Sequence, residues 1–208
     1  MSKERLDFIH RFEPSKEHGD TRVLLLLHAT GGDENQMVPI AHTLAPEATF
    51  LSPRGKIVEN GNARFFRRFA EGVFDEEDLV FRTSELAEFV EKACMEYSLD
   101  CSNIIAIGYS NGANIAASLL LLQPQVLAGA VLFRPMVPLI PQKIPKLDGK
   151  RIFIAAGKSD PIVSVEQTMQ LCDLLRQAGA DVTLHWEDSG HAIVGGDIKA
   201  ARNWMESR

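Results

Sequence analysis

The chain has 208 residues and a formal charge of −6, from 22 Lys and Arg residues against 28 Asp and Glu residues. Hydrophobic residues make up 45% and charged residues 24%, which is typical of a globular domain with one sizeable core. The mildly acidic balance argues against a nucleic-acid-binding protein and against a polybasic membrane-surface protein. We therefore expect a single domain over residues 1–208, with neither nucleic acid nor membrane as a partner.

The cysteines and the amino terminus favour a cytoplasmic location. The three cysteines, Cys94, Cys101 and Cys172, leave one unpaired whichever two are joined, and none lies in a C-x-x-C motif. We expect three reduced thiols. Residues 1–5 do not resemble the start of a signal peptide. The first aliphatic run, over residues 23–27, is far shorter than the roughly 20 residues that a membrane span needs.

Short apolar runs alternate with segments of helical periodicity along the chain. Runs that are apolar at every position suit strands buried on both faces, as in parallel sheets. The predicted strands cover residues 8–12, 23–27, 48–52, 104–107, 127–133, 152–156 and 182–186. One predicted helix follows strand 23–27 and contains His42, and the others cover residues 79–97, 113–122, 164–179 and 193–205. Ser164 and Gln167 form a capping-box pattern that predicts the start of the helix over residues 164–179. This alternation predicts an α/β fold, with a mostly parallel sheet of six or seven strands and helices on both faces.

Two long segments interrupt the alternation, over residues 53–74 and 134–145. Long loops in compact domains are usually functional, and open α/β sheets bind ligands beyond the carboxyl ends of their strands. We expect these segments to form a minimal lid over a shallow site. The side chains expected to line this substrate pocket are Phe65, Phe66, Arg67, Phe69 and Met136. The alternative is that the aromatic rings form a small satellite core under the loop.

The strongest chemical signal is a G-x-S-x-G sequence at residues 108–112, between a predicted strand and a predicted helix. A chain of this composition would contain only about 0.06 such matches by chance. In this context the motif is a nucleophile elbow, a turn so tight that it strains the serine and exposes its hydroxyl. Gly108 and Gly112 are expected there because a side chain at either position would collide with a neighbouring element. Ser110 is therefore the predicted nucleophile.

A serine nucleophile needs a general base, and the base needs a carboxylate that orients it. Among the six histidines, His191 is the one in a loop after the last predicted strand, where this architecture places the base. Asp160 follows the preceding predicted strand and is the expected acid. Asp188 is the alternative, although a residue so near on the same loop cannot easily reach the far ring nitrogen. The non-catalytic interpretations are an exposed loop histidine and a turn or capping aspartate.

Ester hydrolysis also needs two amide donors for the oxyanion of its intermediate. The first is expected from Asn111, directly after the nucleophile. The second is expected from Thr30, in the small-residue loop that follows strand 23–27. A simple Gly-Gly turn is the alternative for this loop. The chain has no dinucleotide fingerprint and no clustering of metal ligands, so no cofactor or metal is expected.

Four segments together resemble the phospholipase/carboxylesterase branch of the α/β-hydrolases, which includes acyl-protein thioesterases and small bacterial carboxylesterases. These segments are Leu27–Gly32, Gly108–Gly112, Gly157–Val163 and Gly190-His191. Residues 52–55 and 64–68 look most similar to bacterial members linked to quinone and hydroquinone stress. The resemblance extends from about residue 23 to about residue 204.

The resemblance implies an α/β-hydrolase fold, with Ser110, Asp160 and His191 as a catalytic triad. It also implies that the amides of Thr30 and Asn111 bind the oxyanion. The chain departs from the family's usual His-Gly sequence because Ala29 follows His28. A Cβ at this position disfavours a positive φ.

The expected function is hydrolysis of small carboxylic esters or thioesters through an acyl-enzyme. One alternative is a ligand-binding sensor that keeps the hydrolase scaffold but turns over little substrate. Another is a lysophospholipase or acyl-protein thioesterase. An edge strand or a helix face is compatible with a homodimer.

Overall fold

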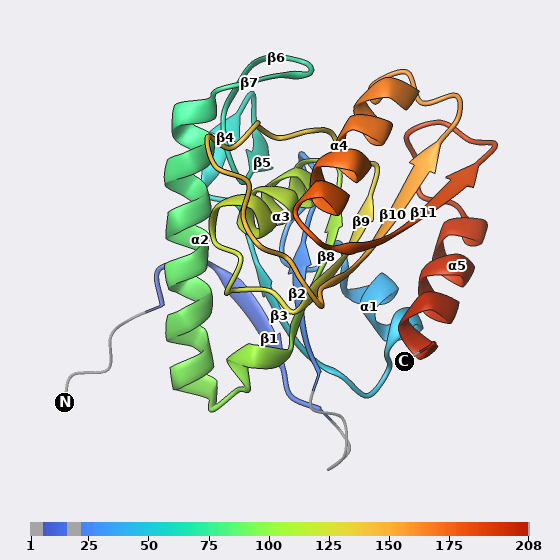
Figure 1. Ribbon diagram of the computed structural model, residues 1–208. Coiled ribbons are helices and arrows are strands. Elements are labelled where there is room, and N and C mark those ends of the chain that lie inside the picture. The colour runs from blue at the N-terminus through green and yellow to red at the C-terminus, as the bar shows by residue number, and fades with distance from the viewer. Residues whose placement is uncertain (1–5, 16–21, 208) are drawn as a thin grey trace.

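The computed structural model describes residues 6–15 and 22–207. Residues 1–5, on which the expectation of a cytoplasmic location partly rests, lie outside the described residues. A seven-stranded sheet has the order β1-β3-β2-β8-β9-β10-β11 and is parallel except for β1, which runs antiparallel to β3 (Figure 1). Its strands are β1 (His10–Glu13), β2 (Val23–Leu27), β3 (Thr49–Pro53), β8 (Ile104–Tyr109), β9 (Gly129–Phe133), β10 (Arg151–Gly157) and β11 (Asp181–Glu187).

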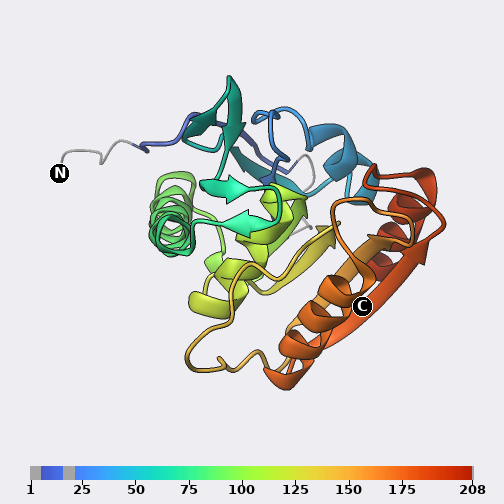
Figure 2. The same cartoon turned by 90° about the horizontal axis from the view of Figure 1, so that it is seen from above.

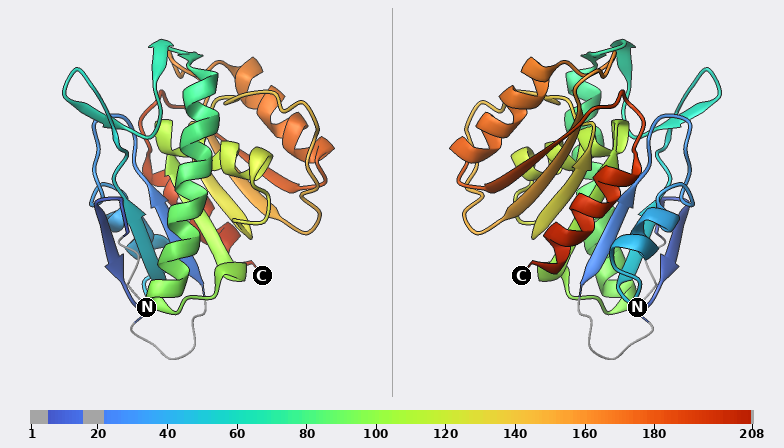
Figure 3. Two further views of the ribbon diagram at one scale, coloured as in Figure 1. Left: turned by 90° about the vertical axis from the view of Figure 1, so that its left-hand side faces the viewer. Right: turned by 90° about the vertical axis from the view of Figure 1, so that its right-hand side faces the viewer.

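Helices cover both faces of this sheet, with α1 and α5 on one side and α2, α3 and α4 on the other (Figures 2 and 3). The helices are α1 (Val38–Leu44), α2 (Glu76–Tyr97), α3 (Asn111–Leu122), α4 (Val165–Gln177) and α5 (Gly195–Glu206), with a short 3₁₀ helix, η1 (Cys101–Asn103). The predicted fold class is confirmed. None of the helices in the described part of the chain has both the length and the apolar character of a membrane span.

The continuous apolar run of β2 has a simple physical cause. Successive side chains of a strand point to opposite faces of the sheet. Leu25 and Leu27 pack in the core beneath α2, α3 and α4, whereas Leu24 and Leu26 pack in the core beneath α1 and α5. Every residue of β2 is buried, because both faces of this central strand are covered.

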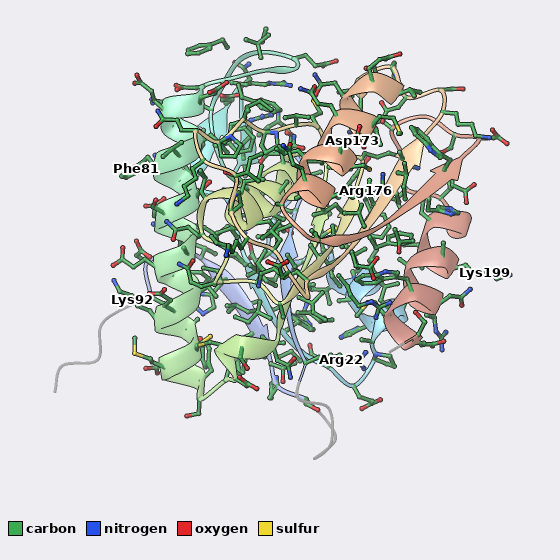
Figure 4. The ribbon with its side chains drawn as sticks, in the orientation of Figure 1. Arg22, Phe81, Lys92, Asp173, Arg176 and Lys199 are labelled. Carbon is green, nitrogen blue, oxygen red and sulfur yellow. The ribbon has the colours of Figure 1, made fainter. Side chains whose placement is uncertain are left out.

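Helix α2 is amphipathic, with one face buried in the core and the other exposed to solvent. Asp75 caps the amino terminus by accepting a hydrogen bond from the amide of Asp78 (3.1 Å). Leu79 and Leu86 on the inner face are fully buried. Phe81 points away from the sheet toward solvent (Figure 4), and the guanidinium of Arg82 stacks on its ring. The helix therefore packs on α3 through one face only.

The segment 53–74, expected as a loop, contains two small hairpins. One pairs β4 (Ile57–Glu59) with β5 (Asn62–Arg64), and the other pairs β6 (Arg68–Ala70) with β7 (Val73–Phe74). The first hairpin turns at Asn60-Gly61, whose φ values of 52° and 79° are both left-handed. Asn-Gly is the sequence signal for such a two-residue turn, so this hairpin was predictable.

All three cysteines are free thiols, as expected. Cys94 and Cys172 are buried, and burial raises their pKa values to about 12 and about 11. Because the thiolate is the reactive form of cysteine, neither of these two side chains is suited to act as a nucleophile.

Candidate active site

The serine of the G-x-S-x-G motif lies between the end of β8 and the start of α3. Ser110 has φ 51° and ψ −112°, a positive-φ conformation that is rare for residues with a Cβ. A Cβ on Gly108 would lie 2.6 Å from the Gly112 carbonyl oxygen, and one on Gly112 would overlap the Leu27 carbonyl of the neighbouring strand. The expected need for glycine at both positions is confirmed.

Three predicted site residues form one hydrogen-bonded row. His191 Nδ1 lies 2.8 Å from Asp160 Oδ2, and His191 Nε2 lies 2.9 Å from Ser110 Oγ. An ionised carboxylate only accepts hydrogen bonds, so Nδ1 carries the ring proton and Nε2 is free to accept the serine proton. The three side chains come from the turns after β8, β10 and β11, which end at the same edge of the sheet.

A turn of its own holds the Asp160 carboxylate in place. Its Oδ1 atom accepts hydrogen bonds from the amides of Ile162 (2.8 Å) and Val163 (3.1 Å), which leaves Oδ2 for His191. Oδ1 therefore makes the hydrogen bonds of the turn, and Oδ2 makes the contact with His191. The Asp160 side chain is 1% exposed, whereas the rival Asp188 is 87% exposed and pairs with Lys158. The geometry favours Asp160 as the partner of the histidine.

The loop after β2 offers one amide at the same edge. Strands β2 and β8 are neighbours, with Leu27 paired to Gly108, so this loop emerges beside Ser110. Within the described residues, Thr30 N donates no hydrogen bond. The neighbouring amides are occupied: Ala29 N donates to Gln36 Oε1, Gly31 N to Ala63 O and Gly32 N to Ala29 O.

The other predicted oxyanion donor, Asn111, begins α3, where the first amides of a helix have no intrahelical acceptor. Ala29 does not disturb this arrangement. In the loop, the left-handed conformation falls on Gly31 (φ 80°), and Ala29 is not among the described residues with positive φ. The replacement of the family's glycine by Ala29 therefore needs no strained backbone.

Residues 64 and 65 hydrogen-bond to the side chains of both predicted oxyanion residues, which the sequence alone did not predict. Arg64 Nη1 donates to Thr30 Oγ1 at 2.6 Å, and Arg64 Nε lies 3.3 Å from Glu59 Oε2. Burial lowers the pKa of Arg64. The amide of Phe65 donates to Asn111 Oδ1 at 2.8 Å. The segment around Arg64 therefore connects the loop after β2 to the start of α3.

His28 fastens the loop after β2 from inside the protein. Its Nε2 atom accepts a hydrogen bond from the amide of Gly55 (2.8 Å), so the ring proton lies on Nδ1, which donates to Ala29 O (2.7 Å). Burial is the main cause that lowers the pKa of His28. The neutral ring is therefore the form that fits this position.

The buried neutral His28 predicts an acid-sensitive contribution to stability. Its pKa is lower in the folded chain than in the unfolded one, so the unfolded chain binds more protons between the two values. This contribution is complete above the unfolded pKa of about 6.5 and is lost as pH falls through the folded pKa. His28→Gln, which keeps a donor and an acceptor, should flatten the curve of unfolding free energy against pH below about 6.5. Parallel curves for the two proteins would contradict the assignment.

The expected pocket lining needs a correction. Phe65 and Phe66 lie in the hydrophobic core beneath α2 and α3, so they cannot line an open pocket. Phe66 packs edge-on against Phe74. Phe69 and Arg67 reach solvent, and Met136 is mostly buried. These two rings do not form a satellite core under the loop either, because both belong to the main core on this side of the sheet. The sequence alone does not reveal which aromatic side chains turn inward.

Phe66 and Phe69 form a matched pair for a stability measurement. Phe66 is 0% exposed and Phe69 is 76% exposed. Phe66→Ala should lower the free energy of unfolding by about 3–5 kcal/mol, because it removes a fully buried ring. Phe69→Ala should change it by less than about 0.5 kcal/mol. Chemical denaturation of both variants measures this difference, and equal losses would show that Phe69 also supports the fold.

Among the residues that the structure describes, one group of possible metal ligands lies near the histidine loop. Ligand atoms of His185, Glu187 and Asp197 fall within 4.8 Å of one another. Both carboxylate oxygens of Asp197 already accept hydrogen bonds from Arg134, and His185 Nε2 lies 2.9 Å from Glu187 Oε1. A cation at this place would therefore have to displace a guanidinium, which makes the group a poor metal site.

Comparisons with known proteins identify the family of this fold. The family model described as Phospholipase/Carboxylesterase matches residues 12–207. MhqD of Bacillus subtilis (strain 168), which is named as a hydrolase, is 46% identical over 184 residues, covering 88% of this chain and 92% of that protein. The crystal structure of the Bacillus cereus carboxylesterase has a TM-score of 0.94 at 51% identity and covers 96% of this chain and 94% of its own.

A further solved structure, of YahD with malic acid, has a TM-score of 0.90 at 32% identity, covering 96% of this chain and 98% of that chain. The family match extends over nearly the whole chain, and two of these relatives exceed 45% identity. The chain belongs to the phospholipase/carboxylesterase family of α/β-hydrolases.

Proposed function

We propose that the protein is a serine carboxylesterase that cleaves small carboxylic esters or thioesters. The observation that carries this proposal is the continuous row from Asp160 Oδ2 through His191 to Ser110 Oγ, with contacts of 2.8 and 2.9 Å. The row lies at the carboxyl edge of a parallel sheet, where α/β enzymes bind ligands.

The reaction follows from the position of each atom. Ser110 Oγ attacks the carbonyl carbon of the substrate, and His191 Nε2 takes the serine proton. Asp160 holds Nδ1–H in place and stabilises the charged imidazolium. The oxyanion accepts hydrogen bonds from the amides of Thr30 and Asn111. His191 then gives its proton to the departing alcohol or thiol, which leaves an acyl group on the serine.

Deacylation repeats the same steps with water as the nucleophile. His191 removes a proton from the water, which attacks the carbonyl carbon of the acyl-enzyme. As the bond from that carbon to Ser110 Oγ breaks, His191 returns the proton to Oγ and the carboxylic acid leaves. Every proton transfer in this cycle is assigned to His191, so the proposed chemistry uses no cofactor. We expect the enzyme to be cytoplasmic and to act on a small-molecule substrate.

Two exposed side chains of the expected pocket lining favour a small substrate. Arg67 and Phe69 are the residues of the expected pocket that reach solvent, on and beside the β6–β7 hairpin. Gly72 at the turn of this hairpin approaches the end of the Met136 side chain, so the hairpin meets the segment after β9. We assign Arg67 and Phe69 to contacts with a short acyl or aryl group, because a cation beside a single ring does not suit a long alkyl chain.

A panel of p-nitrophenyl esters with acyl chains from acetyl to palmitoyl, together with a short-chain thioester and a lysophospholipid, tests the proposal. We expect turnover of the short esters and the thioester, with kcat/KM falling as the chain lengthens. No turnover of any compound would favour the ligand-binding sensor. A preference for palmitoyl ester and lysophospholipid would favour the lysophospholipase alternative.

A further inference from the structure

Arg134 follows β9 directly, and its side chain is fully buried (0% exposed). The backbone amide of Arg134 donates to Ala155 O of β10 at 2.8 Å, so this residue is still held by the sheet. Its φ of 55° is left-handed and turns the chain away at this point. A strained conformation at a residue with a Cβ persists only where surrounding contacts hold it, and such residues gather at functional sites.

The guanidinium of Arg134 binds the histidine loop on both sides of His191. Its Nε atom donates to Gly190 O at 3.0 Å. Its Nη2 atom donates to Ala192 O at 2.9 Å and to Ser189 Oγ at 3.0 Å. One rigid, planar group therefore fixes the residue before the histidine and the residue after it.

Asp197 at the start of α5 fixes the guanidinium in turn. Nη1 of Arg134 lies 3.0 Å from Asp197 Oδ1, and Nη2 lies 2.7 Å from Oδ2. Asp197 Oδ2 also accepts a hydrogen bond from the amide of Val194 (2.9 Å), which caps the helix. Both members of the pair are fully buried. A buried ion pair adds little net stability. The effect of this pair is to hold the guanidinium in one orientation toward the histidine loop.

Four consecutive carbonyls of the histidine loop, at residues 189–192, accept hydrogen bonds. Two of these bonds come from Arg134. The other two come from the amide of Ser159 to Ser189 O (3.0 Å) and from the hydroxyl of Tyr109 to His191 O (3.1 Å). Loss of the guanidinium would remove half of these bonds and also the contact with Ser189 Oγ. The backbone that carries the His191 ring would then be free to shift.

We infer that Arg134, oriented by Asp197, is a positioning residue that holds His191 Nε2 within hydrogen-bond reach of Ser110. This inference rests on the proposed esterase function. In this arrangement, the buried ion pair between Arg134, after β9, and Asp197, at the start of α5, positions the general base. A displacement of about 1 Å at a catalytic group can lower a rate by about 100-fold, which sets the scale of the expected effect.

Three variants separate positioning from folding. Arg134→Lys keeps the charge but loses the planar fork that spans the loop and Asp197. Arg134→Met/Asp197→Asn removes both buried charges together and keeps an oxygen that can cap α5. Arg151→Met is the control, since Arg151 stacks on Trp204 at the opposite end of β10. Circular dichroism and thermal melting establish that each protein is folded.

With a short p-nitrophenyl ester, we expect kcat to fall by about 10- to 100-fold in Arg134→Lys and in the double variant, with KM changed less than about twofold. Arg151→Met should match the parent protein. A fourth variant, Arg134→Ala, tests rescue: millimolar guanidinium should restore part of its activity, while equal concentrations of sodium should not. A folded double variant with kcat within twofold of the parent protein would overturn the inference.

A second measurement does not depend on turnover. The Nδ1 proton of His191, hydrogen-bonded to Asp160, is expected to give a far-downfield proton NMR signal that disappears in Asp160→Asn. In the double variant this signal should broaden or disappear, and in Arg151→Met it should remain. An unchanged signal in the double variant would overturn the inference. An absence of ester turnover in the parent protein would contradict the proposed function alone, because the signal still reports how the ring is held.

Discussion

Ser110→Ala should lower kcat for a short aryl ester by about a millionfold, the size of loss measured when the nucleophile of a serine protease triad is removed. The hydroxyl of Ser110 lies 2.9 Å from His191 Nε2, and a methyl group in its place can neither attack the ester nor give up a proton. The reaction rate of purified variant and parent protein measures the change. Melting temperatures should agree closely, since alanine removes a single oxygen atom at a turn.

Ser118→Ala provides a matched serine control for this result. Ser118 lies in α3, where its hydroxyl lies 2.7 Å from that of Thr83 within the core. Its replacement is expected to affect stability and to leave kcat near that of the parent protein. A Ser110→Ala variant that kept more than about 1% of the activity would exclude Ser110 as the nucleophile.

Asp160→Asn should lower kcat by about 10⁴-fold, by analogy with the same change in another triad. An asparagine amide can donate to Nδ1 and so favour the wrong tautomer of His191, in which Nε2 carries the proton. Asp188→Asn is the matched control, because this rival carboxylate is exposed and lies 2.8 Å from the ammonium of Lys158. Kinetics of the two variants decide between the carboxylates: a large loss in Asp188→Asn with a small loss in Asp160→Asn would reverse the assignment.

The main sheet was predictable because its strands are buried on both faces. The run of residues 23–27 was predicted as a strand and matches β2, and the predicted strand over 152–156 lies within β10 (Arg151–Gly157). The predicted cap at Ser164 also forms, with its hydroxyl accepting from the amide of Gln167. The Gln167 side chain instead accepts from the amide of Val137, so the reciprocal half of the predicted capping box is replaced by a tertiary contact.

The candidate site was predictable in its motifs but not in its supports. Short motifs mark Ser110, Asp160 and His191, and their roles stay a prediction that the kinetic variants test. The contacts of Arg134 could not be predicted from the sequence, because Gly190 and Asp197 lie 56 and 63 positions further along the chain. A proline-rich segment after a strand gives no sign of which buried group its arginine will meet.

The direct test of the central claim is covalent labelling with a fluorophosphonate, followed by mass spectrometry of the intact protein and its peptides. We predict one adduct per chain, located on Ser110, and no adduct in Ser110→Ala. Labelling should be much slower in Asp160→Asn, because the base then holds the wrong tautomer. An adduct on another residue, or labelling that persists in Ser110→Ala, would contradict the assignment of Ser110 as the nucleophile of an esterase.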